Sequence, residues 1–247
     1  MDLGLAGRTA VVCGASSGMG LAVSEALRAE GADVVMLARR AELLEREAAR
    51  IGARAVVGDL THAADVERLV DVAATEHGGI DVLVLNGGGP PPGPAVGMTA
   101  ESVAAAVELL LTGHVRLVGR CLPALRASGR GRIVAIESSS VREPLPNLAL
   151  SNAVRPGVVG WLKTLARELG PDGITVNVIA PGRIDTDRFR QVYPDGLPPA
   201  DLGGIALQRI GTPAEIAAVA CFLASDAAAY VTGAVVPVDG GFTRALL

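Results

Sequence analysis

The chain has 247 residues, of which 50% are apolar and 19% charged, and its net charge is −4. This length is enough for one large domain or two small ones, with a core that needs no disulfide or metal for stability. The acidic balance argues against a nucleic-acid partner, which would require a basic face. No signal peptide and no uninterrupted apolar run of about 18 residues is visible, so we expect a cytoplasmic protein with no membrane partner.

The three cysteines, Cys13, Cys121 and Cys221, lie far apart along the chain. Their spacing matches neither a metal site nor a disulfide framework. We therefore expect no bound metal and a reducing environment.

Seven short apolar runs rich in β-branched residues predict strands. Because the runs are almost continuously apolar, both faces of the sheet should be covered. The predicted strands are Thr9–Cys13, Asp33–Leu37, Arg54–Val57, Val82–Leu85, Ile133–Ile136, Thr175–Ile179 and Ala234–Val238.

Longer segments with helical periodicity alternate with these strands. They are Gly20–Glu30, Ala41–Ile51, Ala64–Glu76, Ala100–Ala127, Ser151–Gly170 and Pro213–Ser225. The alternation predicts an α/β fold: a doubly wound, Rossmann-like sheet of seven parallel strands in a single domain spanning residues 1–247. In this architecture ligands bind beyond the carboxyl ends of the strands, where the long loops Gly87–Gly97 and Tyr193–Gly204 lie.

A glycine-rich loop, residues 14–20, separates the first predicted strand from the first helix. Its glycines would let the backbone approach a pyrophosphate, while the helix N-terminus supplies amides and the positive end of its dipole. A glycine motif alone is weak evidence, but its place inside a βαβ unit favours a dinucleotide site over a plain turn. The loop residues expected to contact the cofactor are Gly14, Ser16, Ser17, Gly18, Met19 and Gly20.

Two arginines, Arg39 and Arg40, follow the second predicted strand. An NAD site usually carries an acidic residue here, whereas guanidinium groups suit the 2′-phosphate of NADP. We therefore expect NADP(H), with NAD less favoured, although a solvated helix start would also explain the two arginines. Asp59, just past the third strand, is expected to accept from the adenine amino group, to cap the next helix, or to do both. Leu60 beside it is included in the expected cofactor site.

Five motifs, which follow one another along the chain in the family's order, make the chain resemble the short-chain dehydrogenase/reductase family over nearly its whole length. In the motif formed by Asn86-Gly87-Gly88, Leu85 stands at the first position of the family's Asn-Asn-Ala-Gly motif. The type most similar is the 3-oxoacyl-carrier-protein reductase. The segments that carry the resemblance are Gly14–Gly20, Pro181–Thr186, Asn86-Gly87-Gly88, Arg209–Glu215 and Val231–Gly241.

The resemblance implies an NADP(H)-dependent oxidoreductase that interconverts the carbonyl and alcohol forms of a small molecule. It also implies a homo-oligomer, a dimer or a homotetramer, that packs through the long fourth and fifth helices. Beyond the glycine loop, the residues that it places beside the cofactor are Asn86, Gly87, Arg155, Pro181, Gly182, Ile184 and Thr186.

The catalytic positions depart from the family pattern. The family uses Asn, Ser, Tyr and Lys, and the corresponding positions here are Leu110, Ser138, Ser151 and Arg155, so only Ser138 is retained. A serine hydroxyl is much less acidic than a phenol and is therefore a poor general acid. Ser151 and Arg155 still share one helix face, because they are four residues apart.

Two main interpretations follow. In the first, Ser138 and Ser151 hold the substrate oxygen and Arg155 anchors the cofactor ribose, which gives a re-tuned oxidoreductase. In the second, the chain is a non-redox member of the fold, either a dinucleotide-binding regulatory subunit or a lyase or isomerase. A weaker possibility is an inert partner of an active homologue in a mixed oligomer.

Three further side chains could supply a proton. His114 titrates in a suitable range, but a structural or interface role would also explain it. Glu137 ends the fifth strand, where burial could raise its pKa, unless it forms a salt bridge with Arg142 or Arg155. Tyr193 lies in the loop that closes over the substrate in the family, or is a plain surface residue.

Overall fold

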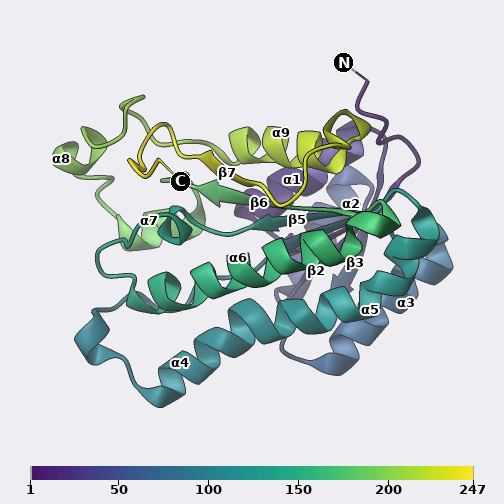
Figure 1. Cartoon of the computed structure of the whole chain (residues 1–247), viewed down its shortest axis with the longest axis horizontal. Helices are drawn as coiled ribbons and strands as arrows, with labels where there is room; N and C mark the ends of the chain where they lie inside the picture. Colours follow the sequence, from purple (N-terminus) through teal and green to yellow (C-terminus); the bar gives the residue numbers. More distant parts are fainter. Residues whose placement is uncertain (1, 247) are drawn as a thin grey trace.

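The computed structural model describes residues 2–246 and contains one sheet of seven parallel strands in the order β3-β2-β1-β4-β5-β6-β7 (Figure 1). The fold class predicted from the sequence is therefore confirmed, and each predicted strand ends within two residues of the observed one. The strands are β1 (Thr9–Cys13), β2 (Asp33–Ala38), β3 (Arg54–Val57), β4 (Val82–Asn86), β5 (Arg132–Ile136), β6 (Thr175–Pro181) and β7 (Val235–Val238).

Two helical layers cover the sheet. One contains α1 (Gly18–Ala29), α2 (Ala41–Ile51) and α9 (Pro213–Ala224); the other contains α3 (Ala63–His77), α4 (Ala100–Val107), α5 (Gly113–Ser128) and α6 (Ala149–Leu169). Successive strand residues point into opposite layers. Val11 packs in the core beneath α3, α5 and α6, whereas Val12 packs beneath α1 and α9. This alternation explains why the strand sequences are apolar throughout.

The long helix predicted over 100–127 is interrupted. A π-helical turn, Glu108–Thr112, joins α4 to α5, and Leu110 within it is fully buried. In the described part of the chain, the combined helical segment Ala100–Ser128 is long and apolar enough to span a membrane by length and composition alone. Here it packs against α3 and α6, and 33% of its most apolar window is buried.

Two short helices, α7 (Asp187–Val192) and α8 (Pro199–Leu202), lie in the connection between β6 and α9, and α8 lies within the segment Tyr193–Gly204 that was predicted as a loop. The strand order reverses between β1 and β4, which are neighbours at the centre of the sheet. The loops that follow the central strands therefore converge at one edge of the sheet, where doubly wound folds bind ligands.

Candidate active site

Three positions of the loop between β1 and α1 require glycine. Gly14 and Gly18 have φ of +59° and +58°, in the left-handed region that disfavours side chains. A Cβ on Gly20 would lie 2.3 Å from the carbonyl oxygen of Gly14. The loop is therefore a tight backbone cradle with no room for side chains on its inner side.

Asn86, at the end of β4, holds this cradle in place. Its Nδ2 donates hydrogen bonds to the carbonyl oxygens of Cys13 (3.0 Å) and Gly14 (3.3 Å). These bonds fix the end of β1 to the end of β4 at the centre of the sheet. An asparagine at this position of the family motif is therefore explained by its contacts, because its side chain positions the glycine loop.

The N-terminus of α1 is not capped by a side chain. Ser17 precedes the helix and its side chain makes no capping hydrogen bond, so the amides of the first turn stay available. The side chain of Thr186 comes within 3.4 Å of where a Cβ on Gly18 would lie, so it borders the loop. Open amides, a positive helix end and a backbone-lined cradle together fit the pyrophosphate of a dinucleotide.

Arg40 extends this cradle toward the end of β2. Its Nη2 donates to the hydroxyls of Ser17 (2.5 Å) and Ser16 (3.2 Å) and pairs with no carboxylate of residues 2–246. Arg39 is different, because its guanidinium lies 3.5 Å from Asp59 and 71% of its side chain is exposed. The two arginines predicted as equivalent are therefore distinct, and Arg40 is the better placed for a phosphate beside the loop.

The side chain of Asp59 stabilises a local turn. Its Oδ1 accepts from the backbone N–H (3.0 Å) and the hydroxyl (2.9 Å) of Thr61. Burial raises the pKa of Asp59, but the Thr61 hydrogen bonds and the Arg39 charge outweigh burial and leave the pKa below its usual range. Leu60 has a buried side chain, and its carbonyl oxygen accepts from Arg116 on α5 (2.9 Å). The contacts of Asp59 with Thr61 close a turn ahead of α3, whose N-cap is His62, so Asp59 does not cap that helix; its contact with the adenine stays a prediction.

A cleft at the carboxyl ends of β4, β5 and β6 brings together the expected catalytic residues and the cofactor residues expected near the nicotinamide. The rest of the expected cofactor site lies beyond this cleft, in the glycine loop and after β2 and β3. The predicted residues that line the cleft are Met19, Asn86, Gly87, Ser138, Ser151, Arg155, Pro181, Gly182, Ile184 and Thr186.

Three serines are linked at this cleft. The Oγ of Ser138 accepts from the backbone N–H of Ser140 (3.1 Å), which leaves the Ser138 hydroxyl proton free to be donated. The hydroxyls of Ser140 and Ser151 lie 3.0 Å apart in a buried hydrogen bond. Ser140 was not among the predicted site residues, although the run of three serines after β5 pointed to this place.

Arg155 forms a buried ion pair with Glu137. Its Nη1 donates to the Glu137 carboxylate at 2.8 Å, and the two side chains are 8% and 0% exposed. Burial raises the pKa of Glu137, while the positive charge and hydrogen bond of Arg155 oppose that rise. Of the salt bridges considered for Glu137, the one with Arg155 forms; Arg142 instead lies 3.4 Å from the carbonyl oxygen of Val235.

His114 lies behind Gly87 and does not act as an acid. The imidazole is 1% exposed, and its Nε2 lies 3.5 Å from where a Cβ on Gly87 would be. Burial, together with the Arg155 charge, lowers the pKa of His114 to about 4. The ring is therefore neutral near pH 7 and holds no imidazolium proton to donate there.

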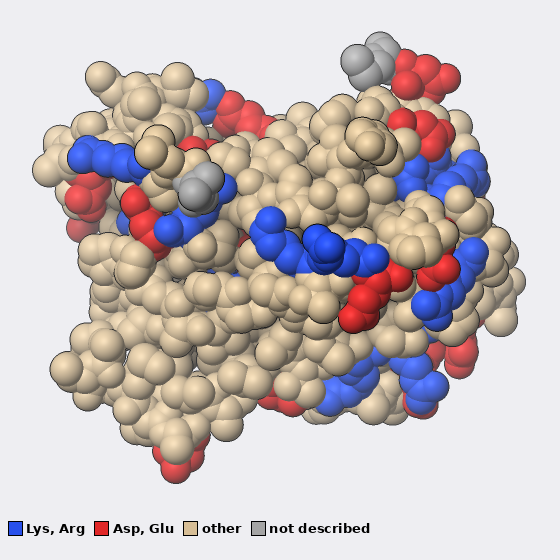
Figure 2. Space-filling model, in the orientation of Figure 1, with Lys and Arg blue, Asp and Glu red and all other residues tan. Residues whose placement is uncertain are grey.

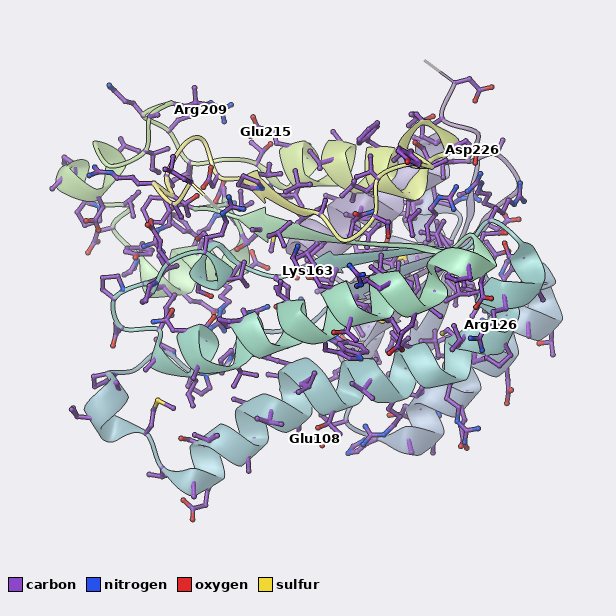
Figure 3. All side chains as sticks on the ribbon, in the orientation of Figure 1. Glu108, Arg126, Lys163, Arg209, Glu215 and Asp226 are labelled. Atoms are coloured by element: carbon purple, nitrogen blue, oxygen red, sulfur yellow. The ribbon has the colours of Figure 1, made fainter. Side chains whose placement is uncertain are left out.

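Tyr193 does line the cleft. Its ring packs against Phe189, with centroids 5.0 Å apart, and beneath the guanidinium of Arg183 at 5.6 Å. The single lysine of the chain, Lys163, points from α6 toward β7 and donates to the carbonyl oxygen of Gly233 at 2.9 Å (Figure 3). Within residues 2–246 no three His, Cys, Asp or Glu side chains gather as a metal site would require.

The sheet, its switch point and the glycine cradle define an α/β protein of the dinucleotide-binding class. A family model described as "Enoyl-(Acyl carrier protein) reductase" matches residues 14–243. The 3-oxoacyl-(acyl-carrier-protein) reductase MabA of Mycobacterium tuberculosis is 36% identical over 234 residues, which cover 95% of this chain and 92% of MabA. The chain belongs to the short-chain dehydrogenase/reductase family, an oxidoreductase family, as the sequence predicted.

Two solved structures share the fold. L-Sorbose reductase from Gluconobacter frateurii, complexed with NADPH and L-sorbose, is 32% identical, has a TM-score of 0.91 and is matched over 100% of both chains. A short chain oxidoreductase from Pseudomonas aeruginosa PAO1 is 30% identical, with a TM-score of 0.90 over 96% of this chain and 97% of the other. Its structure is described as NADPH-bound and "containing an atypical catalytic center".

Proposed function

We propose that this protein is an NADP(H)-dependent oxidoreductase that interconverts a carbonyl group and an alcohol in a small molecule. The observation that carries the proposal is the intact cradle at Gly14–Gly20, with Arg40 bound to its serines, directly beside a cleft that contains Ser138 and Ser151. The NADPH bound in the two related structures supports the choice of cofactor. The whole chain, residues 1–247, would act as one domain.

The cofactor would lie along the carboxyl edge of the sheet. Its pyrophosphate fits the glycine loop and the start of α1, and its 2′-phosphate fits Arg40, with Arg39 nearby. Asp59 and Leu60 would border the adenine, whereas the nicotinamide half belongs to the cleft. The residues assigned to that half are Met19, Asn86, Gly87, Arg155, Pro181, Gly182, Ile184 and Thr186. When bound, the dinucleotide supplies or accepts a hydride.

Ser138 and Ser151 would hold the reacting oxygen. Ser138 has an uncommitted hydroxyl proton, and Ser151 has one whenever Ser140 donates in their shared hydrogen bond. Two such donors stabilise the negative charge that develops on a carbonyl oxygen as it is reduced. Arg155, one helical turn away, would hold the cofactor ribose with the nitrogens that its ion pair with Glu137 leaves free.

The oxygen also needs a proton, and the cleft offers no strong acid for it. His114 is neutral near pH 7, and the ring of Tyr193 is packed against Phe189 and Arg183 at the end of α7. We therefore assign the transfer to Ser138, which would pass its proton to the oxygen and recover one from solvent water. Because serine is a weak acid, we expect turnover well below that of a family member with a catalytic tyrosine.

One observation favours the alternative of a non-redox dinucleotide-binding protein, either a regulatory subunit or a lyase or isomerase. Arg155 directs a terminal nitrogen to Glu137, so only part of its guanidinium remains for a ribose. Under this alternative the cradle would still bind NADP(H), but no hydride would be transferred to any carbonyl compound.

We further propose a cytoplasmic homo-oligomer, a dimer or a homotetramer, that packs through α4, α5 and α6. Figure 2 shows few charged side chains over α4 and the adjoining part of α6. Two thirds of the most apolar window of the segment Ala100–Ser128 is not buried within one chain. Burying this apolar face against a second copy would remove it from water.

The test is a calorimetric titration of the purified protein with NADPH and NADH. We expect NADPH to bind more tightly, and Arg40→Ala to weaken NADPH binding at least about tenfold while changing NADH binding little. Arg39→Ala should have a smaller effect, because Arg39 is paired with Asp59. Arg46→Ala, which removes an exposed arginine of α2 paired with Glu47, is the control. A protein that binds neither dinucleotide overturns the proposal.

A further inference from the structure

We infer that the substrate carries a carboxylate beside its reactive carbonyl group and that the guanidinium of Arg188 binds that carboxylate. The inference rests on the function proposed above, because it names the class of compound that the cleft accepts. It would make the protein a reductase of oxo acids, or a dehydrogenase of hydroxy acids.

The charges that line the cleft are unbalanced. Arg155, Arg183 and Arg188 face it, whereas Glu137 is the one carboxylate among its lining residues. Glu137 is paired with Arg155, so its charge is already matched. Two positive charges therefore remain without a counter-ion in the lining of a cleft built to take a small molecule. An anionic substrate would balance them.

The loop after β4, residues 87–97, is rich in proline and holds Arg188 in a defined position. We call this segment the proline-rich loop. The Nη2 of Arg188 donates to the carbonyl oxygen of Pro90 at 2.7 Å. The guanidinium also lies against Gly89, since a Cβ there would be 2.8 Å from Nη2 and 2.9 Å from Cζ. This contact spans 98 residues of sequence and ties α7 to the loop after β4, so the guanidinium is placed before any ligand arrives.

The acidic residues nearest Arg188 in sequence do not neutralise it. Asp185 and Asp187 both pair with Arg190, at 3.0 Å and 3.3 Å. Arg188 itself pairs with no carboxylate of residues 2–246. One of its nitrogens is bound to a neutral carbonyl oxygen, which leaves the remaining N–H groups for a carboxylate in a two-bond fork.

The position of Arg188 in the cleft disfavours the charged form of its guanidinium. Partial burial, together with the positive charge of Arg155, lowers the pKa of Arg188. An anion bound to Arg188 would offset this unfavourable environment, so the charge of Arg188 favours an anionic ligand.

Arg183 supplies positive charge to the same cleft but is held differently. Its Cζ lies 5.6 Å from the ring centroid of Tyr193 and 5.2 Å from that of Phe242, so two aromatic rings hold the guanidinium. Such cation–π contacts fix the cation without neutralising it. We therefore assign the direct contact to Arg188 and a supporting field to Arg183.

The test compares short straight-chain 2-oxo acids with their methyl esters, which keep the carbonyl group but lose the charge. Binding to the protein saturated with NADP⁺ is measured by saturation-transfer NMR, so that no turnover is required. At least one acid should bind about tenfold or more tightly than its ester. Arg188→Ala should abolish that preference, and Arg188→Lys should restore it only in part, because a lysine cannot form the fork. Arg120→Ala, which removes an exposed arginine of α5 paired with Glu67 outside the cleft, should leave it unchanged.

Two results overturn the inference. In the first, no acid in the panel binds more tightly than its ester. In the second, Arg188→Ala weakens NADPH binding as much as acid binding, which would make Arg188 a cofactor residue. A wild-type protein that binds no dinucleotide contradicts the proposed function instead, and the panel is then measured without NADP⁺. The two failures are therefore distinguishable.

Discussion

The guanidinium of Arg155 on α6 and the carboxylate of Glu137 at the end of β5 form a buried ion pair 2.8 Å long. The pair joins a helix to the sheet at the cleft. It also orients Arg155, the residue at the family's lysine position, and gives it a neutralising partner. The replacement at that position is thus accompanied by a matching carboxylate, which is what a re-tuned site requires.

Removing one member of this pair should destabilise the protein strongly. Glu137→Gln leaves the Arg155 charge buried without a partner, so we expect the free energy of unfolding to fall by about 3–5 kcal/mol. The double variant Glu137→Leu with Arg155→Met removes both charges and should recover most of that loss. Urea denaturation measures both effects. A double variant no more stable than Glu137→Gln would contradict this account of the pair.

The three linked serines should contribute unequally to activity. With NADPH and a ketone that the wild type reduces, we expect Ser138→Ala to lower kcat/KM by roughly 10²–10³, the usual effect of removing one donor to a developing oxyanion. Ser151→Ala should act similarly. Ser140→Ala should have a smaller effect, because Ser140 acts through Ser151. NADPH affinity should stay constant in all three variants; full activity in both Ser138→Ala and Ser151→Ala would remove these residues from the mechanism.

The glycine cradle should not tolerate a methyl group at Gly20. A Cβ there would lie 2.3 Å from a backbone oxygen, so the loop has to move, and we expect Gly20→Ala to abolish NADPH binding and to lower the melting temperature. Gly119→Ala is the matched control within α5, since no heavy atom lies within 4 Å of its Cβ. It should leave binding intact and raise stability by up to about 1 kcal/mol. Equal NADPH affinity in both variants would argue against a cofactor at this loop.

His114 should make the protein sensitive to acid. Its pKa in the folded protein is about 4, below its ordinary value of 6.5, so between these values the unfolded chain binds a proton that the folded protein does not. The neutral, buried His114 therefore makes its full contribution to the free energy of unfolding above pH 6.5. As the pH falls toward 4, this contribution is lost, and the free energy of unfolding falls by about 3 kcal/mol. His114→Leu should flatten that part of the stability–pH curve. An unchanged slope in this variant would assign the acid sensitivity to other groups.

The fold and the cofactor cradle follow from local sequence. Strands such as Thr9–Cys13 are continuous β-branched and apolar runs, and a glycine-rich turn between a strand and a helix has few alternative uses. The placement of Ser151 and Arg155 on one helix face also follows, because they are four residues apart; that they stand at the family's Tyr and Lys positions stays a prediction from the resemblance.

The cleft could not be predicted to the same degree, because its contacts depend on long-range packing. Ser140 reaches Ser151 only because a short 3₁₀ turn, Ser139–Val141, folds three adjacent serines in different directions. Arg188 contacts Pro90 from 98 residues away in sequence, and no local pattern connects the two. Arg39 and Arg40 are adjacent in sequence, yet their different partners emerge only when β2, β3 and the glycine loop are placed together.

The π-helical turn at Glu108–Thr112 sets the rotation of α4 relative to α5. In an α-helix each residue advances the chain by about 100° around the axis, so deleting one residue of this turn would rotate α4 by about that angle while leaving α5 on the sheet. The face of α4 beside the proline-rich loop would then be exchanged for another. A change of one residue in length, with no substitution in the core, would therefore give a different lining to the pocket between α4 and the proline-rich loop.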